Sequence, residues 1–183
     1  MTLSDVAKYF FQGKVPRDSN AVDFTMGNGY DTLFLSELVA DGRVYAFDIQ
    51  ESAIESTSKR LKEAGASNVT LIHASHSRVK DYVSVPVHAA MFNLGYLPGG
   101  DKSIHTLTES TLEAVSAALE LLAPGGVLTI SVYPGHDEGK KEGEVVEELL
   151  SKTDRRLFSV LKCKMLNSPT SPYIIAVEKS MKG

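Results

Sequence analysis

A glycine-rich loop is the first segment of this sequence whose residue types and spacing could do chemistry. Gly27 and Gly29 flank Asn28 shortly after an apolar run that ends at Phe24. Two glycines so close together let a backbone turn tightly and approach a ligand, and the helix predicted to follow offers free N–H groups. Thr32 stands at the third position of the dinucleotide pattern Gly-x-Gly-x-x-Gly, so the signal for a nicotinamide dinucleotide is incomplete. A turn that merely joins a strand to a helix explains the loop equally well.

An acidic residue follows the second apolar run and adds to this nucleotide signal. Asp48 lies about 20 residues beyond the glycines, a spacing at which a carboxylate can accept hydrogen bonds from ribose hydroxyls. Asp48 could instead cap the helix predicted from Glu51, but its distance from the glycines favours a ligand contact. Ser75 and His76 follow the third run and would border the base in such a site, although a lone histidine in a loop is more often structural.

The fourth apolar run ends in a polar residue. Asn93 closes it, and small residues and the aromatic Tyr96 follow. This order resembles the Asn/Asp-Pro-Pro-Tyr/Phe loop of amino-group methyltransferases, with Leu94 and Gly95 in place of the prolines. In that loop the asparagine carbonyl accepts a hydrogen bond from the target amine and the aromatic ring stacks on the base. Its contribution is therefore the orientation of two bound reactants. A Gly/Pro-rich connection without chemistry is the alternative.

The loop after the fifth run offers further polar groups. Tyr133 and His136 could contact a substrate, and a neutral histidine could take a proton from an ammonium group. Asp137 and Glu138 follow, but adjacent loop residues rarely point at one ion, so no metal site is predicted. The single cysteine, Cys163, excludes an intrachain disulfide. It lies in a late predicted strand, where we expect a buried structural thiol rather than a nucleophile.

The whole chain alternates between short apolar runs and helical stretches, which predicts a parallel sheet with crossover helices. We expect an α/β, Rossmann-like fold: a mostly parallel seven-stranded sheet with helices on both faces. Ligands bind such sheets at the carboxyl ends of the strands, so all these loops should share one edge. The predicted strands are 22–24, 43–47, 69–72, 85–92, 127–132 and a closing pair at 156–162 and 173–178, and the predicted helices are 32–39, 51–64, 108–122 and 142–150.

Length and charge narrow the class of protein. The 183 residues suit a single domain, 1–183. The formal net charge of −4 argues against a protein that coats nucleic acid, although small basic patches remain candidates for contact with one RNA. No signal peptide or membrane span is expected, and a single cysteine fits the cytoplasm. The candidate patches are Arg155, Arg156, Lys162 and Lys164; Lys14 and Arg17; and Arg78 and Lys80.

Four segments together resemble the small bacterial proteins of the "putative rRNA methylase" family, and the similarity runs from about Val15 to Glu178. The resemblance implies a class I methyltransferase that uses S-adenosylmethionine. The family is associated with methylation of the amine of 5-aminomethyl-2-thiouridine at the tRNA wobble position. Met26 and Tyr30 depart from the family pattern. The segments are Asp23-x-Thr25-x-Gly27-Asn28-Gly29-x-Asp31-Thr32, Phe47-Asp48-Ile49-Gln50, Met91-Phe92-Asn93-Leu94-Gly95-Tyr96-Leu97-Pro98-Gly99-Gly100-Asp101 and Tyr133-Pro134-Gly135-His136.

The resemblance also implies roles for individual residues. Asn93 would face both cofactor and amine, with Tyr96 beside it. The methionine part of the cofactor would be held by Gly27, Asn28, Gly29 and Asp31. Its ribose and adenine would be held by Asp48 and Gln50, and Ser75 and His76 would border the adenine.

The leading hypothesis is an N-methyltransferase acting on an aminomethyl group in the anticodon region of tRNA. One small domain offers little surface for an anticodon arm, which favours a homodimer. A methyltransferase of rRNA or of a small metabolite amine is the second hypothesis. A nucleotide-binding module without catalysis is a third, of another class, and an NAD-dependent dehydrogenase is the weakest because of Thr32.

Overall fold

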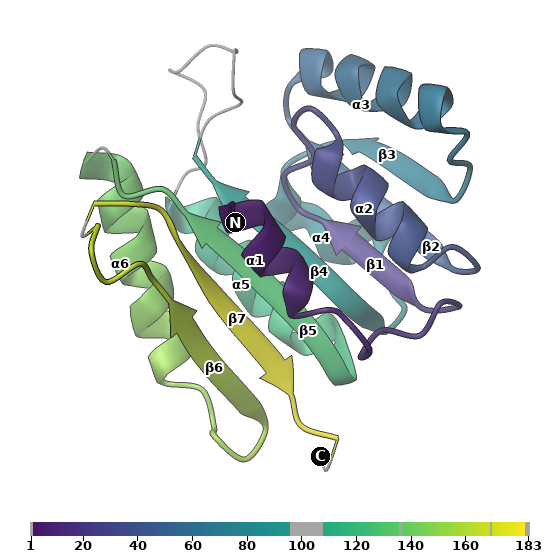
Figure 1. Ribbon diagram of the computed structural model, residues 1–183. Coiled ribbons are helices and arrows are strands. Elements are labelled where there is room, and N and C mark those ends of the chain that lie inside the picture. Colours follow the sequence, from purple (N-terminus) through teal and green to yellow (C-terminus); the bar gives the residue numbers. More distant parts are fainter. Residues whose placement is uncertain (1, 96–107, 136, 169, 182–183) are drawn as a thin grey trace.

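A single twisted sheet organises the molecule (Figure 1). The computed structural model describes residues 2–95, 108–135, 137–168 and 170–181. Within them, seven strands pair in the order β3-β2-β1-β4-β5-β7-β6, and only β7 runs antiparallel to its neighbours. The predicted mostly parallel seven-stranded sheet is confirmed. The strands are β1 Asn20–Asp23, β2 Arg43–Asp48, β3 Val69–His73, β4 Val87–Leu94, β5 Leu122–Val132, β6 Phe158–Cys163 and β7 Tyr173–Lys179.

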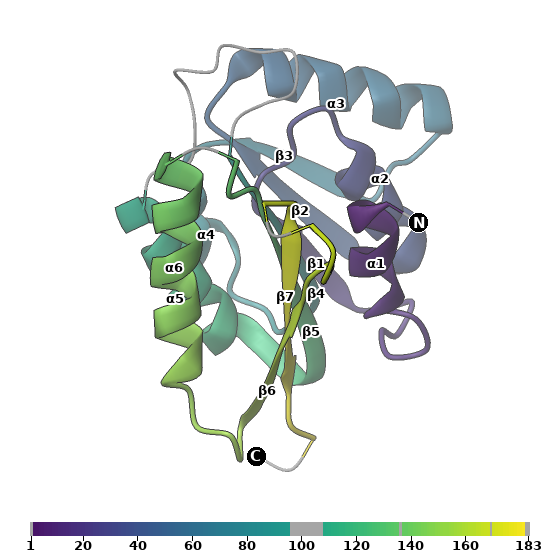
Figure 2. The same cartoon turned by 60° about the vertical axis from the view of Figure 1, so that its left-hand side comes forward.

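Helices cover both faces of the sheet, as predicted (Figure 2). One face carries α1 Leu3–Tyr9, α2 Tyr30–Leu38 and α3 Glu51–Ala64. The other carries the 3-10 turn η1 His76–Arg78 and the helices α4 Val79–Tyr82, α5 Thr108–Leu121 and α6 Asp137–Ser151. The central strands are therefore buried on both sides, which explains why β4 reads as a nearly continuous apolar run.

The largest differences from the sequence-based prediction concern α1, α6 and β5, whereas other boundaries differ by about two residues and the short η1 and α4 were not predicted. Helix α1 was not predicted, although Thr2 and Asp5 form a capping box at its start. Helix α6 begins at Asp137, five residues before the predicted start at Glu142. Strand β5 begins at Leu122 rather than Val127, because a register shift against β4 accommodates the intervening Pro-Gly-Gly segment.

The topological switch point lies between β1 and β4, where the strand order reverses. Strands β1, β2, β4 and β5 all end at the carboxyl edge of the sheet, so Gly27, Asp48, Asn93 and Tyr133, which follow or end these strands, lie along that edge. No helix in the described part of the chain is long and apolar enough to cross a membrane. That residues 1–183 form one domain stays a prediction.

Candidate active site

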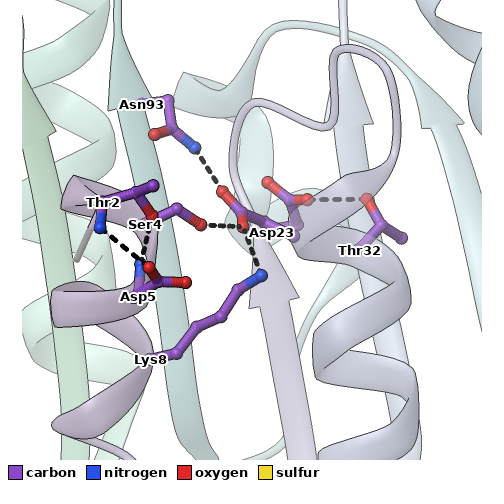
Figure 3. Close-up of polar contacts among 8 residues, drawn as sticks. Thr2, Ser4, Asp5, Lys8, Asp23, Thr32 and Asn93 are labelled. Atoms are coloured by element: carbon purple, nitrogen blue, oxygen red, sulfur yellow. Dashed lines mark hydrogen bonds and ion pairs between the residues drawn. The ribbon is translucent and has the colours of Figure 1, made fainter.

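Strand β1 ends in a buried carboxylate that anchors the loop after it. Asp23 is fully buried, and its carboxylate accepts a hydrogen bond from Thr32 Oγ1 at 2.6 Å (Figure 3). It also accepts one from the Thr25 backbone N–H at 3.1 Å. Burial, and then the nearby negative charge of Asp31, raise the pKa of Asp23 to about 7. The side chain thus ties the start of the loop to the first turn of α2.

The two glycines of the loop adopt the backbone conformation that their type allows. Gly27 has φ 49° and Gly29 has φ 78°, both in the left-handed region that side-chain-bearing residues avoid. Gly29 is also the residue preceding α2, so the loop leads directly into the amino end of that helix. A Cβ on Gly29 would lie 2.8 Å from Thr57 Oγ1, closer than packed atoms approach. Both the conformation and the space therefore require glycine here.

Helix α3 supports this loop from outside, which sequence reasoning missed. Thr57 Oγ1 donates a hydrogen bond to the Gly27 carbonyl at 3.0 Å. Arg60 Nε donates to the Asn28 carbonyl at 2.7 Å, and its guanidinium stacks 3.5 Å from the centre of the Tyr30 ring. Thr57 and Arg60 lie about one helical turn apart on α3, but no sequence signal relates that helix to the glycine loop.

Asp48 joins the ends of β1 and β2. Its Oδ2 accepts a hydrogen bond from the Gly27 N–H at 3.0 Å, and its Oδ1 accepts one from the Gln50 N–H at 3.0 Å. The alternative role as helix cap does not occur, because Gln50 precedes α3 and makes no side-chain cap. An ionised carboxylate has about four acceptor positions, so these two bonds leave capacity for ribose hydroxyls.

Ser75 and His76 follow β3 in different environments. The Ser75 hydroxyl accepts a hydrogen bond from the Ser77 N–H at 3.3 Å and starts the η1 turn. The His76 ring is 8% exposed and packs edge-on against Phe92, with ring centres 5.7 Å apart. Burial lowers the pKa of His76 to about 4, so the ring is neutral near pH 7. Contact of either residue with adenine stays a prediction.

Asn93 and Asp31, predicted for separate roles, are in direct contact. Asn93 Nδ2 donates a hydrogen bond to Asp31 Oδ2 at 2.8 Å, and the Asn93 backbone N–H donates to Thr25 Oγ1 at 2.8 Å. Lys8 Nζ lies 3.6 Å from Asp31 Oδ1, and Ser4 Oγ donates to the same oxygen at 3.4 Å. These α1 residues are a second group that the sequence analysis did not find.

Tyr133 follows β5 and lies near the same carboxylate. Partial burial, and then the charge of Asp31, raise the pKa of Tyr133 above its usual value. The phenol therefore keeps its proton at neutral pH and can donate a hydrogen bond but cannot serve as a base. Tyr96 and His136 lie outside the described residues, and their predicted roles stay predictions.

The remaining cysteine and metal predictions concern other parts of the molecule. Cys163 ends β6 at the far side of the sheet from β4, so its predicted distance from the candidate site is confirmed. The expectation that its thiol is buried is wrong, since β6 is an edge strand and Cys163 is exposed. In the residues that the structure describes, no three His, Cys, Asp or Glu side chains gather as a metal site would require.

The arrangement at the carboxyl edge fits a nucleoside cofactor with a charged tail. The left-handed glycines keep the backbone free of side chains where a ligand would approach, and Asp48 offers acceptor oxygens on the neighbouring strand. The Asn93 amide stands across the switch point, on β4. A cofactor spanning β1 and β2 would therefore present its reactive end toward β4.

Comparisons with known proteins agree with this geometry. A family model described as "Putative rRNA methylase" matches residues 44–179. The chloroplastic tRNA (mnm(5)s(2)U34)-methyltransferase of Arabidopsis thaliana is 39% identical over 188 residues, covering 96% of this chain and 69% of that protein. A "putative rRNA-methylase" crystal structure from Clostridium thermocellum is 42% identical with a TM-score of 0.91, covering 97% of this chain and 96% of its own. A "putative methyltransferase" from Streptococcus mutans, solved with SAH, is 39% identical with a TM-score of 0.90 and 98% of both chains covered.

The fold is shared over nearly the whole chain with a protein that holds SAH, the product that S-adenosylmethionine leaves after giving up its methyl group. Sheet order, glycine loop and β2 carboxylate thus define a class I methyltransferase whose cofactor is S-adenosylmethionine. Within that class, the match over residues 44–179 assigns the chain to the "Putative rRNA methylase" family.

Proposed function

We propose that this methyltransferase methylates the aminomethyl nitrogen of a modified wobble uridine in the anticodon region of tRNA. The observation that carries the proposal is the Asn93 side-chain amide, held at the carboxyl end of β4 beside the glycine loop. An amide carbonyl there suits an amine, because it can accept an N–H hydrogen bond and aim the nitrogen lone pair. The name of the Arabidopsis relative, a tRNA (mnm(5)s(2)U34)-methyltransferase, supports this substrate.

The chemistry requires orientation more than activation. When bound, S-adenosylmethionine supplies a methyl group on a positively charged sulfur, so that a neutral amine forms the N–C bond while the C–S electron pair returns to sulfur. The residues of this chain hold the two reactants in line and exclude water from between them. A proton then leaves the methylated nitrogen, and His136 is the residue to which we assign it.

We assign the binding roles as the family resemblance implies them. Tyr96 stacks on the base, and Tyr133 donates a hydrogen bond to the substrate, since its phenol stays protonated. Asn93 lies between cofactor and amine. The glycine loop and Asp31 hold the methionine part, and the ends of β2 and β3 hold ribose and adenine. The residues in these last two groups are Gly27, Asn28, Gly29 and Asp31; and Asp48, Gln50, Ser75 and His76.

Titration calorimetry with S-adenosylmethionine is the first test, with an Asp48→Ala variant beside the wild type. We expect the variant to bind at least tenfold more weakly, a loss of about 1.4 kcal/mol. Asp41→Ala is the matched control, because Asp41 pairs with Arg17 on the surface, 3.1 Å away. Equal affinity in Asp48→Ala and Asp41→Ala would remove the ribose role from Asp48.

The substrate is tested with the wild-type enzyme and radioactive methyl donor. Transfer to tRNA from cells that lack this enzyme, with none to rRNA or to free amines, is the expected outcome. Transfer to rRNA or to a small amine alone would replace the proposed substrate. Cofactor binding without transfer to any of them would favour a nucleotide-binding module.

We also propose that the enzyme acts as a homodimer. Strand β6 is the last strand of the sheet, and Val160 and Leu161 on it are exposed, which supports a second copy as its partner. Light scattering of the purified protein would give the mass of a monomer if this proposal is wrong.

A further inference from the structure

We propose that Lys8 and Asp31 are positioning residues that fix the orientation of the Asn93 amide, so that its carbonyl oxygen faces the substrate amine. The inference rests on the proposed N-methyltransferase function, adds Lys8 to it, and gives Asp31 a second role beside its contact with the methionine part of the cofactor. The path runs from α1, near the start of the chain, to the end of β4 (Figure 3).

An asparagine amide has two chemically opposite ends, and only one can serve an amine. Its oxygen accepts hydrogen bonds, whereas its NH₂ group only donates them. An ionised carboxylate only accepts, so Asp31 can pair with the NH₂ end of Asn93 and not with the oxygen. The 2.8 Å bond from Asn93 Nδ2 to Asp31 Oδ2 therefore turns Asn93 Oδ1 away from Asp31. The backbone bond to Thr25 fixes the start of the same side chain.

Asp31 needs a counter-charge to keep this position. It lies close enough to Asp23 for its charge to raise the pKa of that carboxyl, and Asp48 contributes in the same direction. Three carboxyl groups thus lie in this region, Asp23 at the end of β1, Asp48 at the end of β2 and Asp31 in the first turn of α2. Lys8 Nζ lies 3.6 Å from Asp31 Oδ1, and the two side chains are only 29% and 15% exposed, so solvent screens this pair less than a surface pair.

Contacts of Lys8 and of helix α1 hold the lysine in place. Its ammonium lies 5.0 Å from the centre of the Phe34 ring on α2. The capping box fixes the first turn of α1, with Thr2 N–H bonded to Asp5 Oδ2 at 2.8 Å and Asp5 N–H bonded to Thr2 Oγ1 at 3.2 Å. Ala7 is fully buried, which seats the helix on the sheet. The helix therefore delivers Ser4 and Lys8 to Asp31 as a preformed pair.

The test compares Lys8→Met with the wild type in methyl transfer to tRNA. Methionine keeps a long apolar stem but removes the charge. We expect kcat to fall about tenfold or more while the Kd for S-adenosylmethionine changes less than twofold; Lys8→Arg should recover kcat to within about threefold of the wild type. The control is Lys152→Met, which removes an exposed lysine paired with Glu148 at 2.6 Å and should change nothing. If Lys8→Met does not fold, Lys8→Gln replaces it.

A second readout is independent of turnover. In protein labelled with ¹⁵N-asparagine, the Asn93 side-chain amide signal, identified by its loss in Asn93→Ala, should shift in Lys8→Met and stay in place in Lys152→Met. Wild-type kcat together with an unmoved amide signal in Lys8→Met would overturn the inference. If the wild type methylates no tRNA, the proposed function fails, and the amide signal alone decides whether Lys8 positions Asn93.

Discussion

The buried carboxyl of Asp23 makes the stability of this protein depend on pH. Its pKa rises from 3.8 to about 7, so the folded state retains a proton that the unfolded chain releases. The Asp23 carboxyl makes its full contribution to the free energy of unfolding below about pH 4. This contribution, roughly 4 kcal/mol in all, is lost as the pH rises toward 7. Asp23→Asn cannot titrate. The unfolding free energy of the wild type should therefore fall relative to Asp23→Asn between pH 4 and 7, as urea titrations would show.

The comparison between the two proteins is needed because His76 has the opposite effect. Its pKa is lowered by burial to about 4, so its contribution is complete above pH 6.5 and is lost as the pH falls toward 4. The two slopes oppose each other in the wild type, whereas the contribution of His76 cancels in the difference between wild type and Asp23→Asn. Any lost hydrogen bond of the variant adds an offset that does not vary with pH. Curves that stay parallel from pH 4 to 7 would show that folding does not raise the pKa of Asp23.

Sequence reasoning found residues whose place follows from the strand order, but not their mutual contacts. Gly27, Asp48 and Asn93 each stand at the end of an apolar run, so a parallel sheet brings them to one edge. The contact between Asn93 and Asp31 depends on side-chain directions. That between Asp31 and Lys8 joins α1 and α2, which no local pattern relates.

The same difference appears at the scale of whole elements. Long periodic stretches such as α3 and α5 were predicted nearly to the residue, because amphipathic helices and their stop signals are local features. Helix α1 has seven residues, which is too short for that periodicity, and only its capping box marks it. The early start of β5 was hidden because Pro and Gly there normally end an element, whereas here a register shift against β4 absorbs them.

Helix α3 is more than a crossover, because it fixes the glycine loop. Gly29→Ala tests this at the closest point of approach. An alanine would have to adopt φ 78° and place its Cβ 2.8 Å from Thr57 Oγ1 and 2.9 Å from Thr57 Cα. We expect a loss of about 1–3 kcal/mol in unfolding free energy. We also expect S-adenosylmethionine affinity to fall at least tenfold, because the loop and α3 must separate.

Gly65→Ala is the matched control for that substitution. Gly65 ends α3 with φ 70°, so alanine meets the same backbone strain, but nothing lies within 4 Å of the added Cβ. The control should lose about 1 kcal/mol of stability and bind the cofactor as the wild type does. If both variants bind S-adenosylmethionine equally well, the contact between α3 and the loop does not shape the cofactor site.

At the scale of the whole molecule, charge limits how RNA can be bound. The chain has 19 Lys and Arg against 23 Asp and Glu, and several basic side chains named above are already neutralised. In the patch of Lys14 and Arg17, Lys14 pairs with Glu178 and Arg17 with Asp41. In the patch of Arg78 and Lys80, Arg78 pairs with Asp81 and Lys80 with Glu120. Binding of tRNA should therefore involve few phosphates and a weak dependence on salt.

Lys164 is the best placed basic residue for such a contact. It follows β6, which runs parallel to β4, so it lies at the same edge of the sheet as Asn93, whereas Arg155 precedes β6 at the opposite edge. Lys162, beside it, is paired with Glu147 at 2.6 Å, whereas Lys164 forms no ion pair within 4.0 Å in the described residues and only helps to lower the pKa of Glu147 by its charge. Lys164→Ala should weaken tRNA binding and reduce the slope of log K against log salt by about 0.7–0.9, the value of one lost phosphate contact. Lys80→Ala, which removes an already paired lysine, should leave that slope unchanged. Filter binding between roughly 50 and 200 mM salt, a range over which such slopes are read, distinguishes the two variants. Identical slopes for the wild type and Lys164→Ala would show that the RNA reaches the site without passing over β6.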